Sequence, residues 1–279
     1  MNEVLISAGG EKRLAALAAF EPAQAAVRRA FGLPLEDWEG MARLAEFWDP
    51  PMWAAGCISF HDAMFLYDAV RGVRPRRVLE IGVAAGGSSA VMLRALEDSG
   101  AGVLESFELH PFCYFDRAKP VGCLAREMVP ELVGRWKLNV RETARDAGVR
   151  FAGQNIELAF IDADHRHPAP TADLLWLMPA LAPGAWVVLH DIDLPGVAAA
   201  HEKRTGERVD WNQRGAMELF CGWPFEKVRG GTVGGEIGAT NIGAIRIPEG
   251  GVRAEDLKDV IGREWEMEVG EEMKRVLGL

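Results

Sequence analysis

The sequence of 279 residues predicts an α/β fold, in which a mostly parallel β-sheet carries helices on both faces. From residue 77 onward, short apolar runs rich in Val, Ile and Leu alternate with segments of helical periodicity. The first run, over residues 78–81, ends at a glycine-rich turn that leads directly into a helix. Acids and histidines follow several later runs, at the strand ends where parallel sheets bind their ligands.

The composition is that of an ordinary globular protein, with 49% apolar and 26% charged residues. The net charge of −10 argues against a nucleic-acid partner, because phosphate binding needs a concentrated positive field. Four cysteines without Cys-x-x-Cys spacing argue against a zinc site or a disulfide framework and favour a cytoplasmic location. We expect no membrane span and no signal peptide, because the necessary apolar runs are missing from the sequence.

Residues 1–72 predict an N-terminal helical cap attached to the core. Alanine and leucine at helical spacing cover residues 11–31, where Pro22 is expected to divide the segment into two short helices. A further helix is expected over residues 35–48, ended by a pair of prolines. Ser59 is the expected N-cap of a helix that leads into the first strand.

The core is expected over residues 73–250, and the whole chain reads as one structural domain. The apolar runs predict strands over residues 77–82, 103–108, 136–140, 156–162, 185–190 and 244–247. Helices are expected over residues 171–181 and 212–221. The rest of residues 194–240 reads as irregular and glycine-rich, and residues 251–279 are expected to hold one amphipathic helix over 253–278.

The turn after the first strand has the spacing Glu80-x-Gly82-x-x-x-Gly86. Glycines there let the backbone approach a ligand closely, and the following helix offers unpaired N–H groups at its start. The spacing differs from the Gly-x-Gly-x-x-Gly dinucleotide fingerprint, and a carboxylate at Glu80 would repel a pyrophosphate. This position suits a cationic or hydrogen-bond-donating ligand, such as a nucleoside that carries an amino acid and a sulfonium.

This motif resembles the first motif of class I S-adenosylmethionine-dependent methyltransferases. Residues 103–108 and 157–165 extend the resemblance with two further strands that end in acids. The resemblance implies a Rossmann-like, seven-stranded, mostly parallel sheet whose last strand is antiparallel, and S-adenosylmethionine as the cofactor. It implies that the cofactor is bound by Glu80, Gly82, Ala84, Gly86, Ser88, Glu108 and Asp162. Among these, Glu108 would accept the ribose hydroxyls.

The later strand ends resemble those of metal-assisted small-molecule O-methyltransferases, near the macrocin and cephalosporin-pathway enzymes. The matching segments are Phe-Ile-Asp162-Ala-Asp164-His165 and His190-Asp191. The resemblance implies that Asp162 and Asp191 hold Mg²⁺ and that His165 is the general base. Carboxylate oxygens suit Mg²⁺, and the ion would lower the pKa of an acceptor hydroxyl. The implied reaction is methyl transfer to a hydroxyl group of a small molecule.

The third metal ligand departs from the pattern of these enzymes, and the role of Asp164 has two interpretations. The third metal ligand in these relatives is a carboxylate just before Asp191 or an amide just after it, whereas this chain has His190 and Ile192. As a third ligand, the softer imidazole of His190 would favour an ion such as Mn²⁺; the alternative is a hydrogen-bonded histidine beneath a weakened site. Asp164 either contacts the ligands or orients His165, and we favour the second role.

Further residues have two interpretations each. Phe60 and His61 either pack over the cofactor or belong to the packing of the helix start. Residues 230–241 form either a lid over the acceptor or a surface hairpin. Trp211 and Trp223 either line an acceptor pocket or lie in the core.

Two other functions remain open at this point. One is a nicotinamide-dependent oxidoreductase, against which the glycine spacing argues; the other is a non-catalytic binding protein that keeps the fold. The sequence does not identify the acceptor molecule. A homodimer is compatible with a helical cap, but no motif specifies one.

Overall fold

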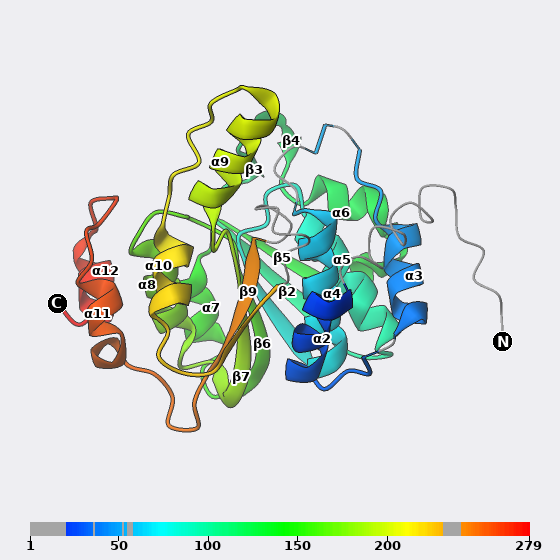
Figure 1. Ribbon diagram of the computed structural model, residues 1–279. Coiled ribbons are helices and arrows are strands. Elements are labelled where there is room, and N and C mark those ends of the chain that lie inside the picture. The colour runs from blue at the N-terminus through cyan, green and yellow to red at the C-terminus, as the bar shows by residue number, and fades with distance from the viewer. Residues whose placement is uncertain (1–20, 36, 52, 55–57, 231–240) are drawn as a thin grey trace.

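The computed structural model describes residues 21–279 except residues 36, 52, 55–57 and 231–240 (Figure 1). Its centre is a seven-stranded sheet in the order β5-β2-β1-β6-β7-β9-β8. The strands are β1 (Arg77–Ile81), β2 (Val103–Glu108), β5 (Trp136–Val140), β6 (Ile156–Ile161), β7 (Leu181–His190), β8 (Lys227–Arg229) and β9 (Ile242–Arg246). The first five are parallel, and β9 is antiparallel to both β7 and β8. The predicted Rossmann-like, mostly parallel sheet is confirmed.

Alternate residues of each strand enter two separate hydrophobic cores. Val78 and Phe160 belong to one core, whereas Leu79, Ile81 and Ile161 belong to the other. This division follows from the two-residue period of a strand, whose side chains point alternately to opposite faces of the sheet. Because helices cover both faces, the strands read as nearly continuous apolar runs in the sequence.

Helices flank the sheet on both sides (Figure 1). One layer contains α2 (Glu21–Ala30), α3 (Trp38–Phe47), α4 (Phe60–Val73), α5 (Gly87–Asp98) and α6 (Cys123–Met128). The opposite layer contains α7 (Ala144–Arg150), α8 (Ala169–Leu177) and α10 (Gly215–Gly222). Ser59 caps α4 as predicted, and α4 packs along α5, so the described part of the expected cap joins one layer of the core. No helix in the described ranges is long and apolar enough to cross a membrane.

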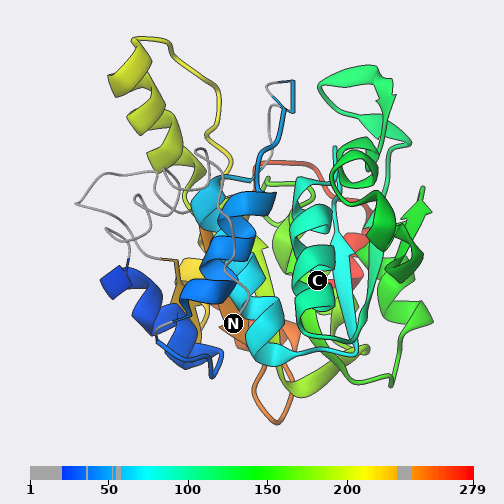
Figure 2. The same cartoon turned by 90° about the vertical axis from the view of Figure 1, so that its right-hand side faces the viewer.

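Two projections rise above the carboxyl ends of the parallel strands (Figures 1 and 2). One is helix α9 (Leu194–Thr205), and the other is a hairpin of β3 (Phe112–Cys113) and β4 (Asp116–Pro120). The prediction of irregular structure at α9 was wrong. Only Leu194 of this helix is buried, so the segment has no apolar stripe that would reveal a helix in the sequence.

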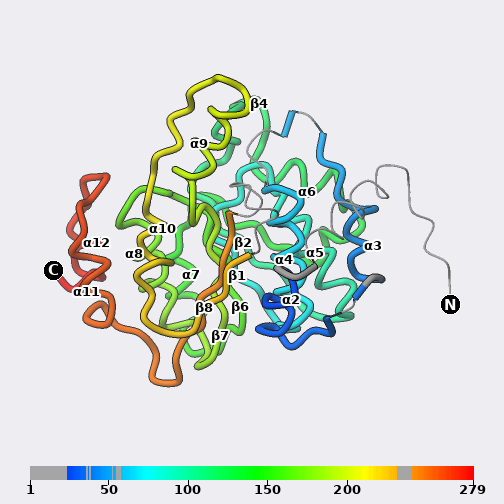
Figure 3. Tube along the Cα trace, in the orientation of Figure 1, coloured from blue at the N-terminus to red at the C-terminus, as the bar shows by residue number. Residues whose placement is uncertain are grey.

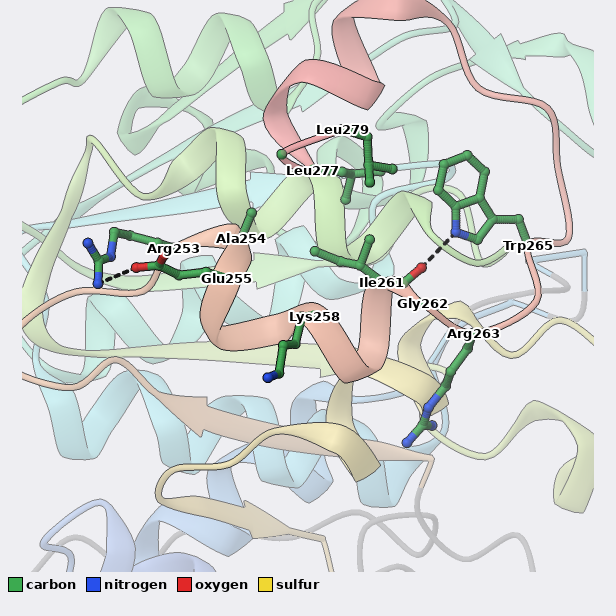
Figure 4. Close-up of a pocket in the computed structure, with 11 residues that line it drawn as sticks. Arg253, Ala254, Glu255, Lys258, Ile261, Gly262, Arg263, Trp265, Leu277 and Leu279 are labelled. Carbon is green, nitrogen blue, oxygen red and sulfur yellow. Dashed lines mark hydrogen bonds and ion pairs between the residues drawn. The ribbon is translucent and has the colours of Figure 1, made fainter.

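The prediction of one helix over residues 253–278 was also wrong. The chain forms the 3₁₀ helix η2 (Ala254–Leu257), α11 (Lys258–Ile261) and α12 (Glu271–Val276). These segments lie outside α8 and α10, on the opposite side of the sheet from α2 and α3 (Figure 3). Residues of η2 and α11, residues 262, 263 and 265, and residues 277–279 after α12 line an open hollow of about 770 Å³ (Figure 4). Residues 262–270, between α11 and α12, do not continue the helix. In this segment Arg263 forms an ion pair with Glu218 of α10, and Glu266 accepts a hydrogen bond from the N–H of His167 in the loop after β6.

Candidate active site

The glycine turn after β1 lies directly against the end of β6. Gly82 and Gly86 have positive φ angles of 87° and 90°, and a Cβ on Gly82 would lie 2.1 Å from the carbonyl oxygen of Asp162. Ala84 adopts a left-handed conformation at φ 45°, which costs a residue with a side chain about 1–2 kcal/mol. The turn therefore needs glycine at Gly82 and brings two of the predicted site segments into contact.

Glu108, at the end of β2, holds this turn. Its Oε2 accepts hydrogen bonds from the N–H groups of Val83 (3.0 Å) and Ala84 (3.3 Å), and its Oε1 accepts one from the N–H of His110 (2.9 Å). A carboxylate has about four lone-pair directions, so these bonds leave one of them for a ligand. One acceptor direction of Glu108 is thus available to a ligand hydroxyl, and the ribose contact expected of Glu108 stays a prediction.

Glu80 and Ser88 are hydrogen-bonded to each other at the start of α5, and their predicted contact with the cofactor stays a prediction. Glu80 is fully buried, and its carboxylate accepts hydrogen bonds from the hydroxyls of Ser88, Ser89 and Ser106. Burial raises the pKa of Glu80 to about 7 against the effect of these hydroxyls, and the nearby charge of Asp162 raises it further. These hydrogen bonds join the end of β1 to the start of α5 and to β2, on both sides of the glycine turn.

The ends of β6 and β7 bring Asp162, His165 and Asp191 together. Their ligand atoms all lie within 4.8 Å of one another. His165 Nδ1 is 3.1 Å from Asp191 Oδ2, and the side-chain amide of Asn241 donates a hydrogen bond to the other oxygen of Asp191. Burial would raise the pKa of Asp191, but the neighbouring His190 and His165 outweigh it and lower the pKa. Asp191 is therefore a carboxylate that can orient the imidazole of His165.

His190 lies among three carboxylates. Its Nδ1 is 3.3 Å from Asp162 Oδ1 and 3.4 Å from Asp191 Oδ1, and its Nε2 is 3.5 Å from Asp62 Oδ2. Burial alone would lower the pKa of His190, but Asp162 and Asp191 outweigh it and raise the pKa well above its usual value. The three surrounding carboxylates thus favour the protonated form of His190. The group whose ligand atoms converge is Asp162, His165 and Asp191, and the expected third ligand His190 lies beside both acids, where its role as a metal ligand stays a prediction.

The donor set of Asp162, Asp191 and His165 fits a divalent cation. Two hard carboxylate oxygens and one imidazole nitrogen form a mixed set that suits an ion such as Mn²⁺. The charged His190 offsets part of the negative charge that would attract the ion. The chemistry of the residues therefore permits a metal without requiring one.

Asp164 does not orient His165, contrary to the expectation from the sequence. Its carboxylate accepts two hydrogen bonds from the guanidinium of Arg166, at 3.0 and 2.6 Å. Burial would raise the pKa of Asp164, but the Arg166 contacts outweigh it and lower the pKa. Asp191 contacts His165 in place of Asp164. The two residues meet because they follow β6 and β7, which are neighbours in the sheet.

Two residues near this cluster were not predicted. Asp62, in the first turn of α4, is buried and accepts a hydrogen bond from the N–H of Asn241 at 2.8 Å. Asn241 Oδ1 in turn accepts one from the N–H of Asp193 at 2.6 Å. The capping box of Ser59 and Asp62 explains the helix start, but no local pattern reveals that Asp62 faces His190.

The aromatic residues that were considered as possible ligand contacts differ in burial. Trp223 is buried in the core on the α10 side of the sheet, and Trp211 is 41% exposed and packs against His201. Phe60 packs partly against the core that contains α4, while its ring also contacts His61. Contact of Phe60, His61 or Trp211 with a ligand stays a prediction. The lid or hairpin expected over residues 230–241 lies largely outside the described residues.

This chain is similar to several solved structures and, over part of its length, to one protein family. No curated protein matches the sequence. The similar solved structures include cofactor-bound Rv0187 from MTB, with 21% identity over 82% of this chain and 90% of that chain and a TM-score of 0.49. They also include the O-methyltransferase TomG from Streptomyces achromogenes in complex with SAM, with 20% identity over 85% and 96% of the two chains and a TM-score of 0.48. Residues 79–192, which carry the glycine turn and the acids and histidines at the ends of β6 and β7, match a family described as a methyltransferase domain.

Proposed function

We propose that this protein is an S-adenosylmethionine-dependent methyltransferase that methylates a hydroxyl group of a small molecule. The observation that carries the proposal is the pair of His165 and Asp191, 3.1 Å apart, at the strand ends next to the glycine turn. The match of residues 79–192 to a methyltransferase domain supports the same activity. When bound, S-adenosylmethionine supplies an electrophilic methyl group on its sulfonium.

The glycine turn and Glu108 form the proposed cofactor site. Gly82 and Gly86 leave the backbone open to close approach by a ligand. Glu108 keeps one lone-pair direction for a ribose hydroxyl while it holds the turn in place. Asp162 lies next to Gly82 and adds a negative charge on the side where a cationic ligand would sit.

His165 is the proposed general base. Because Nδ1 faces Asp191, Nε2 is the nitrogen that can accept the proton of the acceptor hydroxyl. Asp191 then stabilises the imidazolium that forms, and this role needs only the observed contact. His165 is 34% exposed, so a small acceptor can reach it from solvent.

Binding of S-adenosylhomocysteine, measured by isothermal titration calorimetry, tests this function. We expect a saturable one-site binding heat with S-adenosylhomocysteine and none with NAD⁺ or NADH. Transfer of a radiolabelled methyl group to a panel of small alcohols and phenols then separates an enzyme from a binding protein. Binding of NADH in place of S-adenosylhomocysteine would overturn the proposal.

A chelator tests whether a divalent ion assists the reaction. If the carboxylates of Asp162 and Asp191 hold a metal beside His165, EDTA is expected to abolish methyl transfer, and Mn²⁺ or Mg²⁺ to restore it. Asp162→Ala should abolish the part of the activity that responds to metal. Wild-type activity that is unchanged after dialysis against EDTA would show that the enzyme works without the ion.

A further inference from the structure

The C-terminal segment reaches the loop that carries His165. We propose that Glu266 is a positioning residue that fixes the His165 loop, residues 162–168. The expected effect of Glu266 on the rate of catalysis rests on the proposed methyltransferase function. The effect of Glu266 on the position of His165 does not, and it can be tested without measuring turnover.

Glu266 and His167 are joined by two hydrogen bonds. The backbone N–H of His167 donates to Glu266 Oε2 at 2.7 Å, and the backbone N–H of Glu266 donates to the carbonyl oxygen of His167 at 2.9 Å. The Glu266 side chain is 17% exposed, so water competes little for these bonds. This double link fixes the backbone two residues after His165.

Glu266 also holds the start of α10, which contacts the same loop. The backbone N–H of Arg214 donates to both oxygens of Glu266, at 3.1 and 2.9 Å. The next residue, Gly215, donates its N–H to the carbonyl oxygen of His165 at 2.8 Å. A Cβ on Gly215 would lie 2.7 Å from that oxygen, so α10 and the His165 loop are in direct contact. One carboxylate thus joins both backbone segments that hold His165.

The shape of the C-terminal segment explains how Glu266 reaches this position. After α11, the indole N–H of Trp265 donates to the carbonyl oxygen of Ile261 at 2.9 Å (Figure 4). Arg263 forms an ion pair with Glu218 of α10. These contacts hold residues 261–265 against α10 and place Glu266 next to the His165 loop.

Loss of the Glu266 carboxylate should let the loop move. His165 would keep its contact with Asp191, and its loop would keep the backbone bonds from Glu266 and Gly215, but the carboxylate bonds to the N–H groups of His167 and Arg214 would be lost or weakened. A displacement of about 1 Å of a catalytic group can reduce the rate by about 100-fold. The cofactor site should not change, because the glycine turn is held by Glu108 and by the serines around Glu80.

The experiment compares Glu266→Gln with Glu268→Gln, which removes the same charge from an exposed position in the same segment. The Cε1–Hε1 resonance of His165, assigned by its loss in His165→Ala, is expected to shift in Glu266→Gln and to stay unchanged in Glu268→Gln. Under the proposed function, kcat is expected to fall by about 10- to 100-fold in Glu266→Gln alone. The affinity for S-adenosylhomocysteine should be equal in both variants.

Gly215→Ala perturbs the same loop independently, by placing a Cβ against the His165 carbonyl group, and decides the question if Glu266→Gln does not fold. We expect the His165 resonance to shift in this variant as well. An unshifted resonance in the folded variants would overturn the role of Glu266. A shifted resonance in a protein that neither binds S-adenosylhomocysteine nor transfers methyl groups would support the positioning role and refute the proposed function.

Discussion

His165→Ala is expected to lower kcat for methyl transfer by about 10²- to 10⁴-fold, the usual contribution of a general base. The loss should appear in kcat, because the imidazole takes the proton during the reaction and is not needed to bind the cofactor. Isothermal titration should therefore give the wild-type affinity for S-adenosylhomocysteine. Steady-state kinetics with a radiolabelled methyl donor measures the loss.

His201→Ala is the matched control, since it removes an imidazole that packs against Trp211 on the projecting helix α9. It should keep kcat within about threefold of the wild type, as expected for a surface change that leaves the reacting groups in place. Turnover of His165→Ala at the wild-type rate would remove the base assignment. A loss of cofactor affinity equal to the loss of kcat would mean that His165 binds the cofactor and does not act as a base.

The sheet could be predicted because its strands are buried on both faces and stand out as apolar runs. Even the antiparallel β9 was expected, although the three-residue β8 (Lys227–Arg229) was found only in the structure. The errors lie in segments that have no apolar pattern of their own. Helix α9 is almost entirely unburied, and the residues after α11 follow contacts with α10 in place of a helical path.

The candidate site was predictable to the extent that its residues end predicted strands. The structure brings Asp162, His165 and Asp191 together as the strand ends indicated. It assigns the orientation of His165 to Asp191 and pairs Asp164 with Arg166. Such pairings depend on side-chain directions between segments that are distant in the chain, and spacing along the sequence does not contain them.

Asp62 is the clearest example of this limit, and its removal is expected to have the largest effect on stability. Its buried carboxylate accepts hydrogen bonds from the Ser59 hydroxyl at 2.6 Å and the Asn241 N–H at 2.8 Å, and it faces His190. Asp62→Ala should reduce the free energy of unfolding by about 2–4 kcal/mol, because it leaves the Ser59 and Asn241 donors without an acceptor and removes one of the three carboxylates around His190. Thermal and urea unfolding at pH 6 measure this change.

The matched control is Asp146→Ala, which removes the aspartate from the same kind of capping box at the exposed start of α7. A cap of this kind contributes about 1 kcal/mol, so the difference between the two variants isolates the buried contacts of Asp62. An equal loss in both variants would show that the contact between Asp62 and His190 adds nothing to stability.

The contribution of Asp62 should also depend on pH. Burial would raise its pKa, but His190, Ser59 and Asn241 outweigh burial and lower the pKa below the usual 3.8. An acid whose pKa is lower in the folded state stabilises the protein above its unfolded pKa and loses this effect as the pH falls through the folded value. The stability difference between wild type and Asp62→Ala should therefore be large at pH 6 and shrink as the pH falls below about 4. A difference that stays constant down to pH 2 would show that the charge of Asp62 does not stabilise this cluster.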